Sequence, residues 1–333
     1  MRALVYLGPR RMELQEAPEP APGPGEIVFE TRAAAVCGSD LHGFREASPR
    51  RIPPLVMGHE AVGRIAAVGE GADPARVGER VVLKPILACG ACEQCREGRP
   101  NMCTSGRLVG RELTGAFAER FVVPAEAAVP IAEEVPDDLA TLTEPLANAV
   151  HVTSRAVRPG EDVLVIGAGP IGALMARMAL EQGGRRAFIT DPIASRRDLA
   201  KAQGATPLEG DDPETVLREA TDGRGVDVVI DAAGFEATWA LGLRAVRPGG
   251  RIEAVGLGAP AGRIDFFAVA GKEVAVTGSF AWTDEDFAHA LDAIEGGAID
   301  TTGWFTTVPL AEGQRAFEEL VDTSERFKVV LVP

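Results

Sequence analysis

A glycine-rich turn between a buried strand and a helix constrains the fold of this chain most strongly. Residues 162–166 form a short apolar run typical of a buried strand, and residues 171–182 form an apolar helical pattern. The turn between them has the G-x-G-x-x-G spacing, which lets backbone amides approach a pyrophosphate at a helix N-terminus. We therefore predict a dinucleotide site at Gly167, Gly169, Pro170, Ile171 and Gly172. The alternative is that the glycines only permit close packing of strand and helix.

The residue after the next strand indicates which dinucleotide binds. Asp191 follows the predicted strand 187–190, about twenty residues beyond the glycines, where a carboxylate accepts hydrogen bonds from ribose hydroxyls and repels a 2′-phosphate. This spacing favours NAD. Arg196 and Arg197 follow closely and offer a 2′-phosphate a cationic partner, so NADP stays open as the alternative.

The pattern of elements divides the 333 residues into two domains. Residues 1–147 are rich in glycine and proline with short apolar runs, which predicts an irregular, mostly β domain. Residues 148–283 alternate strands with helices at a spacing typical of a parallel, doubly wound sheet. Residues 284–333 carry two helical patterns and a last strand at 328–332, and we assign this segment back to the first domain. The expected class is α/β.

Four of the five cysteines lie in one polar loop, residues 87–105. Cys89, Cys92, Cys95 and Cys103 supply enough thiolates to close a tetrahedral zinc shell with no open position, which predicts a structural zinc. An iron–sulfur cluster is the competing interpretation. That motif expects the fourth cysteine three residues after the third, followed by proline, whereas seven residues intervene here and Thr104 follows. Thiols without a metal are the remaining alternative.

The fifth cysteine belongs to a second group of metal-binding residue types. Cys37 precedes the pair His59 and Glu60, and Glu144 lies just before the dinucleotide domain. One thiolate, one imidazole and one or two carboxylates hold a zinc while leaving a position for an alcohol. The sequence therefore predicts a catalytic zinc here, and two zinc ions per chain.

The runs CGSDLH, GHE, CGACEQC with Cys103, EPLANAVH and GAGPIG, in this order across nearly the whole chain, resemble the zinc-containing medium-chain dehydrogenases. The match is closest to the branch of polyol (sorbitol) and threonine dehydrogenases. The resemblance implies a GroES-like catalytic domain, formed by both ends of the chain, around a central Rossmann domain. It also implies that Cys37, His59 and Glu144 bind the catalytic zinc, and that Glu60 is an adjacent acid that exchanges at the metal.

The same resemblance implies a proton relay through Ser39 and His42. The alternative is ordinary turn chemistry, in which Ser39 caps a helix and His42 is merely exposed. The implied reaction is hydride transfer between a secondary alcohol and NAD. Glu144 stands where ethanol-type enzymes have cysteine, which favours polyol or sugar-like substrates. The alternatives are a threonine or aminocyclitol dehydrogenase with the same site, and a non-catalytic descendant that binds nucleotide.

The composition of the chain argues against some classes of binding partner. A net charge of −15 argues against nucleic acid and anionic membranes, because binding phosphates needs clustered Lys and Arg. No apolar run is long enough to span a bilayer, and the first residues lack a signal-peptide pattern, so we expect a cytoplasmic protein with a small-molecule substrate. The family resemblance implies a dimer or tetramer, with residues 274–280 as the candidate contact strand.

Overall fold

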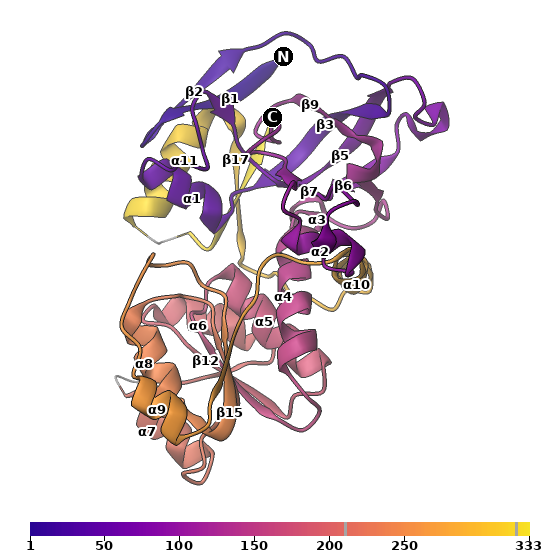
Figure 1. Cartoon of the computed structure of the whole chain (residues 1–333). Helices are drawn as coiled ribbons and strands as arrows, with labels where there is room; N and C mark the ends of the chain where they lie inside the picture. Colours follow the sequence, from indigo (N-terminus) through magenta and orange to yellow (C-terminus); the bar gives the residue numbers. More distant parts are fainter. Residues whose placement is uncertain (210–211, 324–325) are drawn as a thin grey trace. The chain divides into compact units, whose positions relative to one another are not determined.

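The structure is a computed structural model that describes residues 1–209, 212–323 and 326–333 (Figure 1). The chain forms two compact units. Unit 1 comprises Met1–Glu144 and Ala290–Pro333, and unit 2 comprises Pro145–His289. The divisions fall within two helices, α4 (Thr143–Ala156) and α10 (Asp284–Glu295). The last segment of the chain thus belongs to the same unit as the first.

Unit 1 is mostly β, as predicted. Its largest sheet has the strand order β10-β6-β5-β3-β18-β17, with β9 also paired to β3, and two smaller sheets have the orders β2-β1-β4 and β7-β8. The strands are β1 (Arg2–Gly8), β2 (Arg11–Glu16), β3 (Glu26–Ala35), β4 (Leu55–Val56), β5 (Glu60–Val68), β6 (Arg80–Leu83), β7 (Ile86–Leu87), β8 (Arg107–Leu108), β9 (Arg120–Pro124), β10 (Ala128–Pro130), β17 (Phe305–Pro309) and β18 (Lys328–Val332).

Short helices complete unit 1. They are α1 (Gly38–Arg45), α2 (Glu93–Arg96), α3 (Asp137–Ala140) and α11 (Gly313–Asp322), with 3-10 turns at Pro74–Arg76, Pro100–Met102, Ala125–Ala127 and Leu310–Glu312. Helix α11 is amphipathic and inserts Phe317 between Phe44 of α1 and Phe117, with ring centroids 5.2 and 5.8 Å apart. These apolar contacts anchor both ends of the chain in one core.

The middle of the large sheet of unit 1 fixes the positions of the metal-binding residue types. Strand β3 pairs antiparallel with β5, with Ala35 opposite Glu60, and with β18, with Ala35 opposite Val330. Cys37 follows the end of β3, and His59 precedes the start of β5. Because antiparallel neighbours bring the end of one strand beside the start of the next, these segments meet at one edge of the sheet.

Unit 2 is a parallel, doubly wound sheet with the order β13-β12-β11-β14-β15-β16. Its strands are β11 (Asp162–Ile166), β12 (Arg186–Thr190), β13 (Thr206–Pro207), β14 (Val226–Asp231), β15 (Val246–Ala254) and β16 (Ala275–Gly278). Its further helices are α5 (Pro170–Glu181), α6 (Ala194–Lys201), α7 (Pro213–Ala220), α8 (Glu236–Ala245) and α9 (Phe266–Gly271). The predicted α/β class and the predicted alternation of strands with helices are confirmed.

The sequence pattern did not predict the strand β13 or the start of the strand β15. Strand β13 has only two residues, too few for a periodic signal, and β15 starts at Val246 although Pro248, Gly249 and Gly250 interrupt its pattern. In the part of the chain that the structure describes, no helix is long and apolar enough to cross a membrane.

Candidate metal and dinucleotide sites

The structure brings Cys37, His59 and Glu60 together. One potential ligand atom from each lies within 4.8 Å of the others. His59 and Glu60 are buried, with 4% and 1% of their surface exposed, and Cys37 is half-buried. A buried cluster of thiol, imidazole and carboxylate is a suitable zinc donor set with access from one side.

Asp40, in the first turn of α1, orients this cluster. Its Oδ1 lies 3.6 Å from Nδ1 of His59, and its Oδ2 accepts a hydrogen bond of 3.3 Å from the backbone N–H of Cys37. Asp40 is fully buried. Nδ1 of His59 finds no hydrogen-bond partner among the described residues, so the hydrogen bond between His59 and Cys37 involves Nε2. Asp40 thus lies on the Nδ1 side of the imidazole, which leaves Nε2 for Cys37 and a metal.

The acidic groups around His59 favour a positive charge at this position. Burial disfavours the imidazolium form of His59, but the neighbouring Asp40, Cys37 and Glu144 outweigh burial and raise the pKa of His59 to about 10. Without a metal, a proton on the imidazole therefore supplies the positive charge. A divalent cation would replace that proton, as metal binding to histidine requires.

Glu60 has a partner that the sequence analysis missed. Its Oε2 lies 2.5 Å from Nζ of Lys328, which also donates a hydrogen bond of 3.1 Å to the carbonyl of Val36. Lys328 is only 4% exposed. The signal in the sequence was a lysine at the start of the otherwise apolar strand Lys-Val-Val-Leu-Val, because a lysine in a buried strand needs an acidic partner.

Glu144 lies outside the group of three whose ligand atoms converge, and it is 8% exposed. Its charge is near enough to help raise the pKa of both His59 and Lys328. The prediction that Glu144 binds zinc therefore stays a prediction. The carboxylates of Asp40, Glu60 and Glu144 and the thiol of Cys37 lie near His59 or Lys328, and such a group of donors suits a divalent cation.

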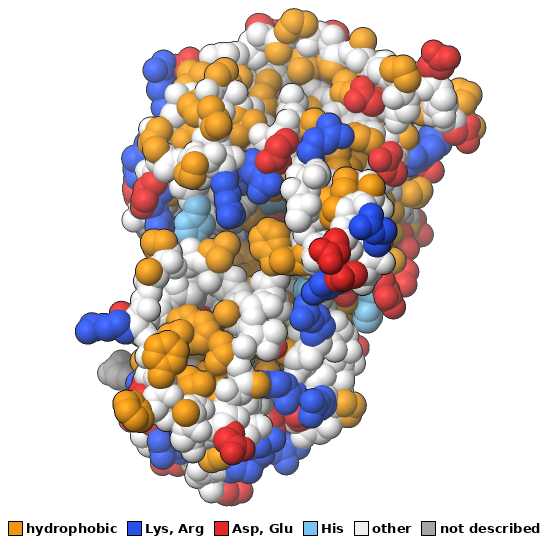
Figure 2. Space-filling view, viewed as in Figure 1, with side chains coloured by type: hydrophobic (Ala, Val, Ile, Leu, Met, Phe, Trp, Pro, Cys, Tyr) orange, Lys and Arg blue, Asp and Glu red, His pale blue; other side chains and the backbone are white. Residues whose placement is uncertain are grey.

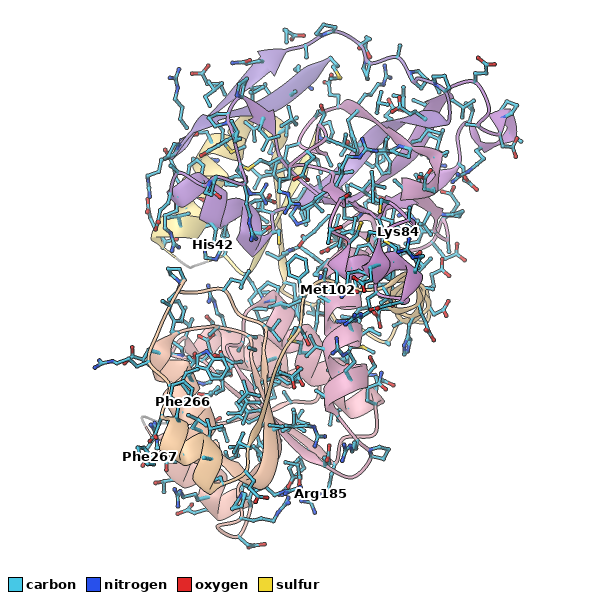
Figure 3. All side chains as sticks on the ribbon, viewed as in Figure 1. His42, Lys84, Met102, Arg185, Phe266 and Phe267 are labelled. Carbon is cyan, nitrogen blue, oxygen red and sulfur yellow. The ribbon has the colours of Figure 1, made fainter. Side chains whose placement is uncertain are left out.

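The predicted relay residues both belong to α1. Ser39 and His42 are exposed, and Figure 3 shows His42 on this helix. Helix α1 begins at Gly38, so Ser39 lies inside the first turn, and its Oγ accepts a hydrogen bond of 3.1 Å from Nη2 of Arg51. The alternative in which Ser39 caps the helix is therefore wrong. Burial of part of the ring and the nearby charge of Arg45 lower the pKa of His42, which favours the neutral imidazole.

The four-cysteine loop has the geometry of a closed metal shell. All four sulfur atoms lie within 4.8 Å of one another, with Cys92 Sγ 3.5 Å from Cys95 Sγ and 3.8 Å from Cys103 Sγ. A tetrahedron with Zn–S bonds of about 2.3 Å has sulfur–sulfur edges of about 3.8 Å. Backbone N–H groups of Cys95 and Thr104 lower the pKa of Cys92 to about 6, whereas burial and the neighbouring thiol of Cys92 raise the pKa of Cys95 to about 12, so the first thiolate forms at Cys92.

The glycine turn of unit 2 has three different physical requirements. Gly167 has a φ of +99°, which favours glycine, and a Cβ on Gly172 would lie 1.9 Å from the carbonyl oxygen of Gly167. Gly169 is the N-cap of α5, Pro170 is the first residue of that helix, and a Cβ on Gly169 would meet nothing within 4 Å. The space beside Gly169 is thus left free for a ligand at the helix N-terminus, which fits a pyrophosphate.

Asp191 is fixed next to this turn. Its Oδ2 accepts a hydrogen bond of 2.9 Å from the N–H of Ala168, and its Oδ1 accepts one of 2.8 Å from the N–H of Ile193. Arg196, in α6, has a buried Nε without a hydrogen-bond partner among the described residues. A fixed carboxylate and an unpartnered donor suit the ribose end of a dinucleotide.

Known proteins match both halves of the chain. The alcohol dehydrogenase GroES-like domain matches residues 23–133, and the zinc-binding dehydrogenase domain matches residues 170–296. The L-threonine 3-dehydrogenase of Pyrococcus abyssi is 38% identical over 76% of this chain and 75% of its own length. That of Pectobacterium carotovorum is 33% identical over 99% of this chain and 98% of its own.

A solved alcohol dehydrogenase from Escherichia coli CFT073, in complex with NADH, is 31% identical and superposes with a TM-score of 0.91 over 100% of this chain and 99% of that chain. The non-catalytic alternative predicts the loss of a zinc-binding residue or a glycine, and this chain keeps both sets. With the family domains and a full-length relative in agreement, this chain belongs to the zinc-binding medium-chain alcohol dehydrogenases, in the branch of the threonine dehydrogenases, and is an oxidoreductase.

Proposed function

We propose that this enzyme uses zinc and NAD to oxidise a secondary alcohol to a ketone, with unit 1 as the catalytic domain and unit 2 as the cofactor domain. The observation that carries the proposal is the convergence of Cys37, His59 and Glu60, with Asp40 behind the imidazole, in a chain that also contains the glycine turn. When bound, the zinc supplies Lewis-acid polarisation of the hydroxyl, and the nicotinamide supplies a hydride acceptor.

The residues of the chain have distinct tasks in this reaction. Cys37, His59 and Glu144 would hold the zinc, and Lys328 neutralises Glu60 beside it. Asp40 keeps Nε2 of His59 turned to the metal side. Ser39 accepts the hydroxyl proton and His42 passes it towards solvent, since both are exposed at the start of the same helix.

At the cofactor, the N–H groups that open α5 face the pyrophosphate, and Asp191 accepts hydrogen bonds from the ribose hydroxyls. Because this carboxylate also repels a 2′-phosphate, NAD is the proposed cofactor. NADP is the alternative, because Arg196 has an Nε without a hydrogen-bond partner among the described residues and could bind a 2′-phosphate.

Two substrate classes have support. The threonine dehydrogenase relatives favour an amino alcohol such as L-threonine. Glu144, in the place of the cysteine of ethanol-type enzymes, favours polyols and sugar-like alcohols. The test is the zinc-loaded enzyme with L-threonine, sorbitol and 2,3-butanediol, with NAD and with NADP, followed as absorbance at 340 nm. Turnover of one class decides between them, and no turnover of any compound contradicts the proposed function.

The metal content tests the two sites separately. We expect two zinc ions per chain by mass spectrometry of metals. Cys89→Ser should remove one ion and leave that at Cys37, while Cys37→Ser should remove the other together with turnover. A wild-type content of one ion, abolished by Cys89→Ser, would show that the Cys37 group is not a zinc site.

The proposed assembly is a homo-oligomer that pairs β16 with the same strand of a second copy. This strand is the last in its sheet order and is exposed along its length, with Val276 44% exposed. Phe266 and Phe267 of the adjacent α9 are 76% and 94% exposed (Figure 3), and hydrophobic side chains gather on this face of unit 2 (Figure 2). Val276→Lys should lower the mass measured by light scattering, and an unchanged mass would contradict this interface.

A further inference from the structure

Arg51 is a buried arginine that the reaction described above does not use. It packs against α1, its guanidinium lies 3.0 Å from Oδ1 of Asp40, and only 6% of its surface is exposed. Arginine is seldom buried unless its donors are paired. Two of its contacts are with Asp40 and Ser39, which lie within three residues of Cys37.

The guanidinium group joins three segments of unit 1. Nη1 donates a hydrogen bond of 3.0 Å to the carbonyl of Gly110. Nη2 lies 3.0 Å from Oδ1 of Asp40 and donates a hydrogen bond of 3.1 Å to Oγ of Ser39. Because the Nη2 group carries two hydrogens, one can serve each oxygen. The charge of Arg51 is matched by the fully buried Asp40, so the guanidinium has no unpaired charge to offer a substrate anion.

Helix α1 leaves space for the aliphatic part of the Arg51 side chain. A Cβ on Gly43 would lie 2.1 Å from Cδ of Arg51. Glycine in the middle of a helix is less favourable than alanine, so it needs a packing reason. Gly43 therefore gives Arg51 its place against the first turns of α1.

We propose that Arg51 is a positioning residue that gives the Ser39 hydroxyl a direction for proton transfer. A serine hydroxyl has two acceptor lone pairs and one donor hydrogen. Nη2 of Arg51 occupies one lone pair, which leaves one lone pair to accept the proton of the substrate hydroxyl and one hydrogen to pass on. One proton enters Oγ as another leaves, so the charge of Ser39 does not change. The inference rests on the proposed role of Ser39 in the relay.

A double-mutant cycle tests this coupling, with the best substrate of the panel above. Ser39→Ala should lower kcat by about 100-fold, the usual size of a positioned acid–base group. Arg51→Lys should lower kcat by about tenfold with KM and zinc content unchanged. In the Ser39→Ala background, Arg51→Lys should change kcat by less than about twofold, because its effect passes through Ser39. Arg50→Lys, at the exposed neighbouring position, is the matched control.

Gly43→Ala provides a second variant, which displaces Arg51 without removing any charge. Since alanine is favoured in helices, this variant should stay folded, and it should lower kcat in the wild-type background only. The inference would be overturned if Arg51→Lys or Gly43→Ala lowered kcat by the same factor in the wild-type and the Ser39→Ala backgrounds. It would also be overturned if either variant lost zinc. If Ser39→Ala itself leaves kcat unchanged, the relay role of Ser39 is wrong, which is a separate failure.

A measurement without turnover completes the test. In protein labelled with ¹⁵N-arginine, a fixed guanidinium shows slow rotation and separate Nη signals by NMR. We expect one such signal set to vanish in Arg51→Lys and its Nη2 resonance to shift in Ser39→Ala. Signals that do not respond to Ser39→Ala would show that Arg51 does not act on this hydroxyl, whatever the substrate.

Discussion

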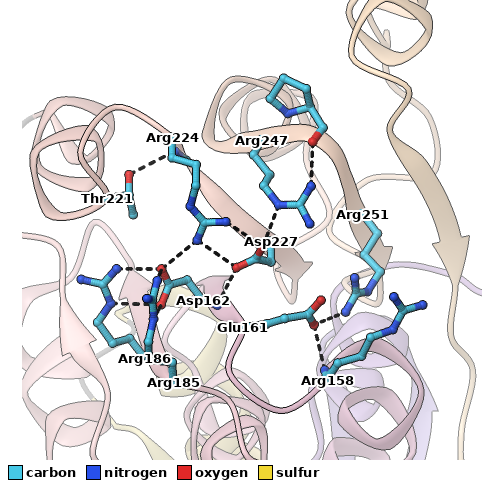
Figure 4. A network of polar contacts seen from close by, with 12 residues as sticks. Arg158, Glu161, Asp162, Arg185, Arg186, Thr221, Arg224, Asp227, Arg247 and Arg251 are labelled. Atoms are coloured by element: carbon cyan, nitrogen blue, oxygen red, sulfur yellow. Dashed lines mark hydrogen bonds and ion pairs between the residues drawn. The ribbon is translucent and has the colours of Figure 1, made fainter.

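Replacing Asp162 by asparagine should weaken unit 2 through loss of charge alone. Asp162 opens β11, and its side chain is completely buried beneath three arginines, Arg185, Arg186 and Arg224 (Figure 4). Burial by itself would raise the pKa of this carboxyl. The hydrogen bonds from Arg186 and Arg185 outweigh burial and lower the pKa of Asp162 to about 2, from 3.8.

The size of the effect follows from this shift. A pKa that falls from 3.8 to about 2 corresponds to about 2 kcal/mol of folding free energy at neutral pH. The partner arginines are between 37% and 53% exposed, so solvent screening reduces this figure, and we expect a loss of about 1 to 2 kcal/mol. Because the folded pKa is depressed, the stabilisation is present above pH 3.8 and disappears as the pH falls towards 2.

The assay is urea unfolding at low salt, combined with hydrogen exchange of peptides from β11, β12 and β14. Asp162→Asn should be less stable than wild type at pH 7, and the difference should fall to about half by pH 3. Asp198→Asn removes the same charge from an exposed position of unit 2 and should change little. A loss no larger than that of Asp198→Asn would refute the reasoning, and a loss that stays constant with pH would assign the effect to packing.

Three further predictions concern the dinucleotide site, the four-cysteine loop and the candidate catalytic cluster. Asp191→Gly should raise the KM for NAD by about 10- to 100-fold, because a charged hydrogen-bond acceptor worth about 1.5–3 kcal/mol is lost, and it should allow NADP to bind. Initial rates with NAD and with NADP measure both effects. An unchanged preference for NAD over NADP would contradict the prediction. Cys89→Ser should halve the zinc content and lower the melting temperature, whereas full zinc retention would rule out a shell of four cysteines. Lys328→Met should lower the free energy of unfolding in urea by about 3–5 kcal/mol, because it leaves Glu60 buried and unpaired. Adding Glu60→Gln should restore most of this stability. A double variant as unstable as Lys328→Met alone would assign the loss to packing.

Elements with strong local patterns were predicted closely. The buried strand, the glycine turn and the helix after it appear as β11, the turn and α5, within one or two residues of their predicted bounds. The signal is local because a strand of apolar residues, a turn that requires glycine and an amphipathic helix each follow from neighbouring side chains. The short strand β13 and the irregular start of β15 carry no such pattern, and their pairing depends on the neighbouring strands.

The sequence by itself determined the four-cysteine loop and the glycine turn, because in each the interacting residues lie within about twenty positions and their spacing carries the geometry. The tertiary structure alone decided how the candidate catalytic cluster is arranged. Lys328 reaches Glu60 across 268 residues only because β18 pairs with β3 beside β5. Arg51 reaches Ser39 because Gly43 leaves room on α1. Such contacts depend on which strands become neighbours and on where space is left, and residue spacing along the chain encodes neither.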